Sequence, residues 1–451
     1  MSDGAPSAGG QPRLAFVYHP RSFGTMAIAE AADGICQLIW VIDTSDPEIS
    51  SMARLLRRLG DVVDVAGLSL GDAAAAIAAA RPDGILALAD SLLLWTARIA
   101  DRLKLPFLSP EIAGRLTDKH EQRLALQRAG VPVPGFWPVP DRDRQADGDA
   151  WEAFEHAVSF PAILKPRRGE GSRDVVRVDS LDELHAQLAD VVAAGASAAT
   201  DGASAVADER PAGTDGTAAP ASDELVLEEY LRDRPEAAGQ PFADYVSVES
   251  VVSDGHVSHL AITGRFPPAQ PFRETGFFIP CAFDQDQCAA IAEMATAAVQ
   301  AIGLQRGALH TEVKLTPDGP RVIEVNGRIG GGVPEMLIDA TGVEFLPMAI
   351  RIALGEQIVF DSMPACTQIG YLLYVQAPSS MHTITAVQGL DELRVRPGVE
   401  EVVLNRGPGR SVDWRAGNHG HVFSVRGSVA SHQQLRSIEQ HATREVQIQG
   451  A

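Results

Sequence analysis

The chain is poor in cysteine, aromatic residues, positive charge and long apolar runs. It has 451 residues with only four cysteines, and aromatic side chains make up 6% of it. No apolar run approaches the roughly 20 residues that span a bilayer, and residues 1–13 lack the basic-then-apolar pattern of an export signal. The cysteines form no CxxC pair, so we expect reduced thiols, no thiolate metal site and a cytoplasmic protein: Cys36, Cys281, Cys288 and Cys366.

The charge balance excludes a general nucleic-acid-binding role. The chain has 38 basic and 59 acidic residues, giving a net charge of −21. Such a surface repels a phosphate backbone. We therefore expect neither a nucleic-acid nor a membrane partner, and an anionic small substrate needs a locally basic site.

The length predicts several structural units. Their expected bounds are a disordered lead at 1–12, an N-terminal α/β domain at 13–115, a central domain at 116–365 and a small β-rich domain at 366–451. A smaller lid is expected within the central domain at about 150–230. Residues 195–222 have almost no large apolar side chain, so we expect a disordered insertion there.

The first unit alternates apolar runs with helix-like segments, which predicts a doubly wound parallel sheet and an α/β fold class. The runs are Leu14–Tyr18, Ile35–Ile42, Val62–Val65 and Gly84–Leu88. The loop after the first run lacks GxGxxG, so we predict no dinucleotide site in it.

Further along, local patterns predict individual elements. A helix begins near Thr117 or Asp118 and ends at Gly130, and another spans Leu181–Ala194. Asp254-Gly255 separates two alternating runs and predicts a β-hairpin. The segment Gln285–Ile302 repeats apolar residues at helical spacing.

The stretch from residue 310 to residue 332 is the most informative. A turn at Pro317–Pro320 predicts two antiparallel strands on either side of it. Because strand side chains alternate, polar residues gather on one face and Ile323 and Val325 face the core. The residues expected on the polar face are His310, Glu312 and Lys314 on the first strand, and Glu324, Asn326 and Arg328 on the second.

Two carboxylates and an amide oxygen on one face suit Mg²⁺, which prefers hard oxygen ligands and shares phosphate oxygens. The alternative interpretation is a solvated hairpin with alternating polar residues. Upstream residues favour the first interpretation. Lys165 ends an apolar strand and precedes a glycine-rich loop, an arrangement that can neutralise and cover nucleotide phosphates.

Taken in order, these motifs resemble the ATP-grasp superfamily and, within it, the L-amino acid ligase branch of the carboxylate–amine ligases. The resemblance covers roughly residues 14–445. The motifs that carry it are Asp118-Lys119, Phe160–Pro166, Glu228–Leu231, Ser247–Ser250, His310–Lys314 and Ile323–Arg328.

The resemblance implies an ATP-grasp fold in which nucleotide binds between a lid and a central antiparallel domain with a β-rich extension. ATP contacts are implied for Lys119, Lys165, Gly171, Ser172, Glu228, Glu229, Tyr230, Leu231 and Lys314. Magnesium, as two ions for which Mn²⁺ can substitute, is implied at Glu312, Glu324 and Asn326. The small-molecule partners are a carboxylate and an amine, and the resemblance suggests a homodimer.

The resemblance also implies substrate contacts. They are Arg265 or Arg273 near a carboxylate, Glu274 near an amino group, Arg328 facing the acyl phosphate or a substrate carboxylate, and N–H donors from Gly330, Gly331 and Gly332. The chain departs from the family pattern in two places. Phe277 stands where histidine is frequent, and Asp244 is the nearest candidate for an acidic residue before Ser247.

The expected reaction joins two amino acids, or similar substrates, through an acyl phosphate. Lys165 and Arg328 would stabilise the charge that moves between oxygens. Either Glu274 or His310 would accept the proton of the amine. Two alternatives remain. One is a ligase or carboxylase that uses bicarbonate or another acid, and the other is a non-catalytic ATP sensor.

Overall fold

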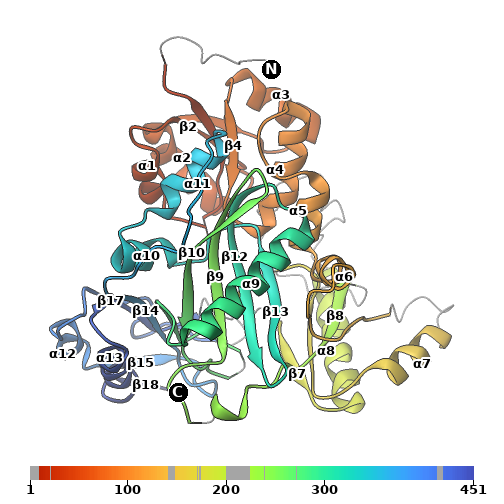
Figure 1. Ribbon diagram of the computed structural model, residues 1–451, viewed down its shortest axis with the longest axis vertical. Helices are drawn as coiled ribbons and strands as arrows, with labels where there is room; N and C mark the ends of the chain where they lie inside the picture. Colours follow the sequence, from red (N-terminus) through yellow and green to blue (C-terminus); the bar gives the residue numbers. More distant parts are fainter. Residues whose placement is uncertain are drawn as a thin grey trace.

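The computed structural model describes residues 10–20, 22–140, 148–169, 171, 174–199, 224–237, 239–270, 272–413 and 420–451. Within these ranges the strands form sheets of four, eight, two and four strands. The parallel sheet lies at one end of the molecule, the C-terminal elements lie at the other, and the eight-stranded sheet lies between them (Figure 1). None of the described helices is long and apolar enough to cross a bilayer.

The N-terminal sheet is parallel, with the order β3-β2-β1-β4, as the alternating sequence pattern predicted. Its strands are β1 (Arg13–Val17), β2 (Gln37–Ile42), β3 (Asp61–Asp64) and β4 (Gly84–Ala87). The connecting helices are α1 (Thr25–Ala32), α2 (Pro47–Leu59), α3 (Leu70–Ala79) and α4 (Asp90–Leu103). Because both faces are covered, β1, β2 and β4 are almost entirely apolar, whereas the edge strand β3 begins and ends with aspartate. Phe16 and Trp40 are fully buried and meet edge to face at 5.6 Å.

Two short helices, α5 (Pro110–Thr117) and α6 (Lys119–Arg128), lead into the rest of the chain. Asp118 caps α6, because its carboxylate accepts hydrogen bonds from the backbone N–H groups of His120 and Glu121 at 3.0 and 3.3 Å. The helix ends before Gly130, whose φ of 74° suits glycine. Both ends agree with the sequence prediction.

The smaller antiparallel sheet has the order β5-β8-β6-β7. It consists of β5 (Phe136–Pro138), β6 (Ala162–Pro166), β7 (Val176–Val178) and β8 (Leu225–Glu229), accompanied by α7 (Gly148–Ala157) and α8 (Leu181–Ala199). Helix α8 continues past the predicted end at Ala194, because alanine favours helix over the next turn. The disordered insertion was therefore placed too early at residue 195, and residues 200–222 of it lie outside the described part of the chain.

The eight-stranded sheet is antiparallel, in the order β13-β12-β9-β10-β11-β14-β17-β16. Its first five strands in chain order are β9 (Tyr245–Ser253), β10 (His256–Arg265), β11 (Gly276–Ile279), β12 (Arg306–Thr316) and β13 (Gly319–Asn326). A single 3-10 turn, Pro235–Ala237, precedes them. Helix α9 (Gln285–Ile302) crosses one face of the sheet (Figure 1) and buries Ile291 and Ala295 against it.

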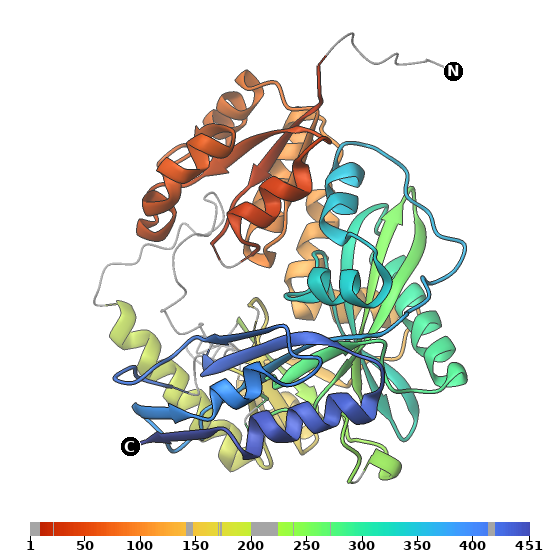
Figure 2. The ribbon, with the colours of Figure 1, turned by 90° about the vertical axis from the view of Figure 1, so that its left-hand side faces the viewer.

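The remaining elements extend this sheet and close its end. After α10 (Val333–Thr341) and α11 (Phe345–Ala353) come β14 (Ile369–Val375), β15 (Ile384–Gln388), α12 (Leu390–Arg394), β16 (Glu401–Leu404), β17 (Phe423–Val429), α13 (His432–Arg444) and β18 (Gln447–Gly450). β14, β17 and β16 join the large sheet, whereas β15 and β18 pair with each other. Figure 2 shows α13 along the side of these strands that lies farthest from the N-terminal sheet.

Candidate functional site

A cavity of about 720 Å³ lies between the smaller sheet and the large one, within the 300–1,000 Å³ range of ligand pockets. It gathers side chains from α6, β6, β8, β12 and β13. Eleven residues singled out in the sequence line it: Lys119, Lys165, Gly171, Glu228, Glu229, Tyr230, Leu231, Glu274, Glu312, Lys314 and Glu324. Ser172, the remaining residue of the predicted phosphate loop, lies outside the described residues.

One wall of the cavity holds a buried triad of charges. Lys165 Nζ lies 2.7 Å from Glu228 Oε2, and Arg123 Nε lies 3.0 Å from Glu228 Oε1. Burial lowers the pKa of Lys165, and the charge of Glu228 opposes that shift. Burial would raise the pKa of Glu228, but Arg123 and Lys165 hold it below its usual range. The carboxylate is therefore ionised and keeps a lysine at the predicted phosphate position.

A second cation, Lys119, joins three parts of the site. Its Nζ lies 3.1 Å from Glu324 Oε1 and donates a hydrogen bond to the Gly169 carbonyl at 2.8 Å. Asp118 accepts two hydrogen bonds from the guanidinium of Arg167, at 3.1 and 2.8 Å. The start of α6 is thus tied to the glycine-rich loop and to β13.

Two carboxylates face each other across β12 and β13. Glu312 is the register partner of Glu324, and both line the cavity. Like charges directly opposite are unfavourable without a cation between or beside them. Burial would raise the pKa of Glu312, but His310 and Arg265 lower it to about 2. A pair of opposed carboxylates fits Mg²⁺, which takes one or two carboxylates and completes its shell with phosphate oxygens and water.

The amide of Asn326 lies beside this pair but does not line the cavity. Its side chain is buried, and Nδ2 donates a hydrogen bond to the His310 carbonyl at 3.2 Å. Within the described ranges no group of three or more His, Cys, Asp or Glu could hold a metal ion alone.

The predicted inward direction of Ile323 is wrong. A register shift after Glu312 pairs Val313 with Val322, so Ile323 is the extra residue of a β-bulge. Val322 takes the core position, and Ile323 lines the cavity instead. Bulges re-aim side chains in this way, frequently beside active sites.

The segment after β8 forms the far wall of the cavity. Backbone groups there are already engaged, because Glu229 N–H donates to the Gly135 carbonyl at 2.7 Å and Tyr230 N–H donates to the Pro161 carbonyl at 3.1 Å. Lys314 forms an ion pair with Asp233 at the same wall. Asp244, the proposed stand-in for the family's acidic residue, lines the cavity and binds Arg234 at 2.7 Å.

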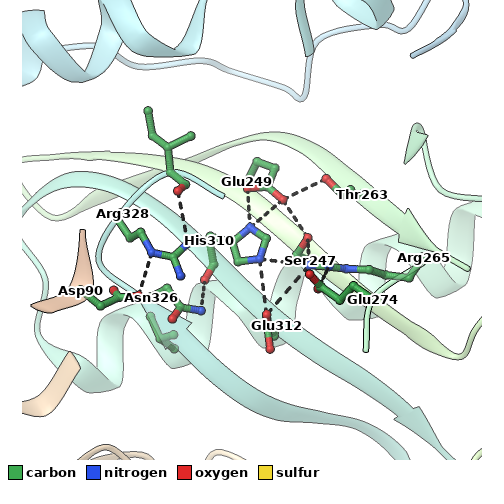
Figure 3. A network of polar contacts seen from close by, with 12 residues as sticks. Asp90, Ser247, Glu249, Thr263, Arg265, Glu274, His310, Glu312, Asn326 and Arg328 are labelled. Atoms are coloured by element: carbon green, nitrogen blue, oxygen red, sulfur yellow. Dashed lines mark hydrogen bonds and ion pairs between the residues drawn. The ribbon is translucent and has the colours of Figure 1, made fainter. Parts of the chain in front are cut away.

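A buried polar network lies behind Glu312 (Figure 3). Glu249 is fully buried and accepts hydrogen bonds from Ser247 Oγ, Thr263 Oγ1 and His310 Nδ1 at 2.8, 2.9 and 2.9 Å. Burial opposes the charged form of His310, but Glu249 raises its pKa to about 9. The ring does not line the cavity.

Arg265 is the centre of the same network and does not line the cavity either. Its guanidinium pairs with Glu274, lies 3.2 Å from Ser247 Oγ and 3.1 Å from His310 Nε2, and stacks on the Phe277 ring at 4.3 Å. Burial raises the pKa of Glu274, and the charge of Arg265 opposes that shift. Of the predicted pair Arg265 and Glu274, Glu274 lines the cavity, from the segment just before β11.

Other predicted substrate residues lie elsewhere. Arg273 donates hydrogen bonds to the Gln270 and Ala377 carbonyls at 2.8 and 3.0 Å, which is a structural role. Arg328 follows the end of β13, and its Nε lies 2.7 Å from Asp90 Oδ2 at the start of α4. Gly330, Gly331 and Gly332 precede α10, and a Cβ on Gly330 would meet His310 Nδ1 at 2.4 Å.

Four residues of this arrangement had no assigned role from the sequence: Arg123, Glu249, Asp90 and Tyr245. Glu249 carried a signal, because it is a charged residue at an alternating position within an apolar strand. All four cysteines are free thiols, and Cys281 Sγ lies 3.5 Å from Cys288 Sγ.

Comparisons with known proteins agree with this geometry. The model of the ATP-grasp domain family matches residues 223–335, from β8 to the start of α10. Carnosine synthase 1 of Gallus gallus is 29% identical over 71% of this chain and 33% of its own length. Alanine–anticapsin ligase of Bacillus subtilis is 28% identical over 49% of this chain and 42% of its own length. The chain thus spans less than half the length of these two relatives.

The crystal structure of an L-amino acid ligase from Bacillus licheniformis superimposes with a TM-score of 0.75. The match covers 98% of this chain and all of that one, at 20% identity, and therefore speaks for the fold. The sheet order, the cavity and the matched segment all lead to one assignment. The chain has the ATP-grasp fold, and its residues 223–335 match the ATP-grasp domain family.

Proposed function

We propose that the protein is an ATP-dependent carboxylate–amine ligase that forms an amide bond through an acyl phosphate. The observation that carries this proposal is the convergence of two lysines, Lys119 and Lys165, with the opposed carboxylates Glu312 and Glu324 around one cavity. Cationic groups suit phosphate oxygens, and paired carboxylates suit a divalent cation.

The comparisons support the same chemistry. The matched family segment contains Glu228, Glu312 and Glu324. The names carnosine synthase, alanine–anticapsin ligase and L-amino acid ligase each describe proteins that join amino acids or their relatives. The proposed substrates are accordingly two amino acids or amino-acid-like molecules.

In the proposed mechanism ATP converts a carboxylate into an acyl phosphate, because a free carboxylate is a poor electrophile. Lys165 and Lys119 would bind the phosphates once they exchange Glu228 and Glu324 for the nucleotide. Bound Mg²⁺, held by Glu312 and Glu324, would neutralise the charge that develops on the transferred phosphoryl group. The incoming amine then attacks the carbonyl carbon and expels phosphate.

The amine must lose a proton, and the geometry favours Glu274 over His310 as the acceptor. Glu274 lines the cavity, whereas the ring of His310 is buried behind Glu312 with Nδ1 on Glu249. A raised pKa makes the Glu274 carboxylate a stronger base than an ordinary glutamate. An ammonium group would also find its counter-charge at Glu274 before it is deprotonated.

The test is a substrate panel with two readouts, phosphate release and mass spectrometry of the products. Pairs of amino acids are incubated with ATP and Mg²⁺, and parallel reactions contain bicarbonate or aliphatic acids instead. We expect phosphate release together with a product lighter by one water than the summed substrates. Release with bicarbonate alone would contradict the amino-acid assignment, and nucleotide binding without release under any condition would contradict ligase activity.

A further inference from the structure

We propose that Glu249 and His310 are positioning residues that hold Glu312 in the orientation needed to bind a divalent cation. This inference rests on the proposed function, because it assumes that Glu312 is a ligand of the nucleotide's cation. It adds two buried residues of β9 and β12 that do not line the cavity and touch no substrate themselves.

The first step is the anchor. Glu249 has no exposed surface and receives three side-chain donors, from Ser247, Thr263 and His310. A fully buried carboxylate is costly, and well-packed apolar residues are frequently as stable or more stable in such a place. Because the Glu249 carboxylate accepts hydrogen bonds from all three donors, it is held in one orientation within the sheet.

The second step is the transfer of that fixed orientation to His310. Glu249 and His310 are direct register partners on neighbouring antiparallel strands. Both carboxylate oxygens lie within 3.0 Å of Nδ1. A hydrogen bond to one ring nitrogen fixes the plane of an imidazole and the direction of the other nitrogen. Gly330 lies close to the same ring, since a Cβ there would meet His310 Nδ1 at 2.4 Å, so the ring has little room to turn.

The third step reaches Glu312 on the next inward-facing position of β12. His310 Nε2 lies 3.5 Å from Glu312 Oε1, and Arg265 Nη2 lies 3.9 Å from the same oxygen (Figure 3). The hydroxyl of Tyr245 also favours the charged form of Glu312 and lowers its pKa. Glu312 is therefore held from the sheet side by three groups while it lines the cavity on the other.

The test measures cation binding rather than turnover. Mn²⁺ is titrated by electron paramagnetic resonance and by calorimetry into protein saturated with a non-hydrolysable ATP analogue. We expect Glu249→Gln and His310→Gln to weaken Mn²⁺ affinity by about 10- to 100-fold, the usual effect of losing a partner behind a metal ligand. Affinity for the analogue without metal should stay within about twofold, since neither residue lines the cavity.

His259 provides the matched control. It is a half-buried imidazole of the same sheet, but its Nδ1 meets Ser250 Oγ at 2.8 Å and its Nε2 meets Thr296 Oγ1 at 2.8 Å, beneath α9. His259→Gln should leave Mn²⁺ affinity unchanged. Equal weakening in this variant would show that any buried polar substitution disturbs the sheet, and would overturn the inference.

The design separates the two hypotheses. If wild-type protein binds no Mn²⁺ with the analogue, the proposed function fails. If wild-type protein binds it and Glu312→Gln does not, but Glu249→Gln and His310→Gln keep wild-type affinity, only the positioning role is refuted. Thermal unfolding of each variant shows which ones fold, and a misfolded Glu249→Gln leaves His310→Gln to decide the outcome.

Discussion

Neighbouring positions of the same strands lead to two very different surfaces of the large sheet. On one face Val246, Val248 and Val313 pack with Ile291 of α9 into an apolar cluster. On the other face the intervening positions of β9 and β12 are Ser247, Glu249, His310 and Glu312, joined by hydrogen bonds and ion pairs (Figure 3).

Burial does not distinguish the two faces, since Val248 and Glu249 are both fully buried. The two faces differ in the interactions that their buried side chains require. An apolar side chain needs only matching shape, whereas a buried carboxylate needs directed donors. The apolar face should therefore govern stability and the polar face should govern binding and chemistry. Substitutions on alternate positions can test this separation.

The largest effect is expected from Glu324→Ala. It removes one of the two opposed carboxylates and the partner of Lys119. Loss of a group that stabilises transition-state charge costs at least about 100-fold, so ADP formation should fall by about 1,000-fold when the cation is lost with it. Phosphate release measures turnover, and calorimetry measures thermal unfolding, in the variant and in the wild-type protein. Near-normal turnover in a folded variant would refute the metal assignment.

A smaller loss, about 100-fold in turnover, is expected for Glu274→Gln, which removes the proposed proton acceptor. Because burial raises the pKa of Glu274, wild-type activity should fall with decreasing pH through a pKa above the usual carboxyl range. The variant should lose that acidic limb. The exposed Glu293→Gln of α9 should keep both rate and profile. An unchanged profile in Glu274→Gln would exclude the residue as the base.

On the apolar face, Val248→Ala should lower the free energy of unfolding by about 2 kcal/mol, through lost methyl burial and a small cavity. A loss of that size raises the equilibrium constant for unfolding by about 30-fold. Nucleotide affinity measured well below the melting temperature should stay within about twofold. Denaturant unfolding measures the free energy of unfolding, and calorimetric titration measures the nucleotide affinity. A large affinity change would show that the two faces are not separable.

The smallest effect, about tenfold in turnover, is expected for Asp90→Asn at the rim of the polar face. It replaces the charged carboxylate that accepts a hydrogen bond from Arg328 Nε with a neutral amide oxygen, which weakens that bond. Nucleotide affinity should not change, since neither residue lines the cavity. Asp101→Asn on the same helix, which breaks an exposed pair with Lys104, should have no effect. Matching behaviour of the two variants would remove Asp90 from the site.

Sequence patterns predicted the parts of this site that depend on local structure. The β12–β13 hairpin, the shared face of Glu312 and Glu324, and the lysine at the end of β6 each follow from the alternation of side chains or from one turn. These features involve residues close in sequence, so a period and a turn determine them.

The remaining features depend on which distant strands become neighbours. Glu249 meets His310 because β9 pairs with β12, and Arg328 meets Asp90 because the N-terminal sheet borders the large one. No local pattern specifies such pairings. The bulge that turns Ile323 into the cavity also escaped prediction, because a strict two-residue period cannot contain an extra residue.

Lys119 has a consequence for how the protein responds to its ligand. Its backbone N–H binds the Arg167 carbonyl at 2.8 Å, while its ammonium group joins Gly169 and Glu324. A nucleotide that recruits this ammonium must therefore compete with the loop after β6 and with β13 at once. By thermodynamic linkage, whatever shifts the equilibrium position of that loop changes nucleotide affinity, and bound nucleotide shifts the loop by the same free energy.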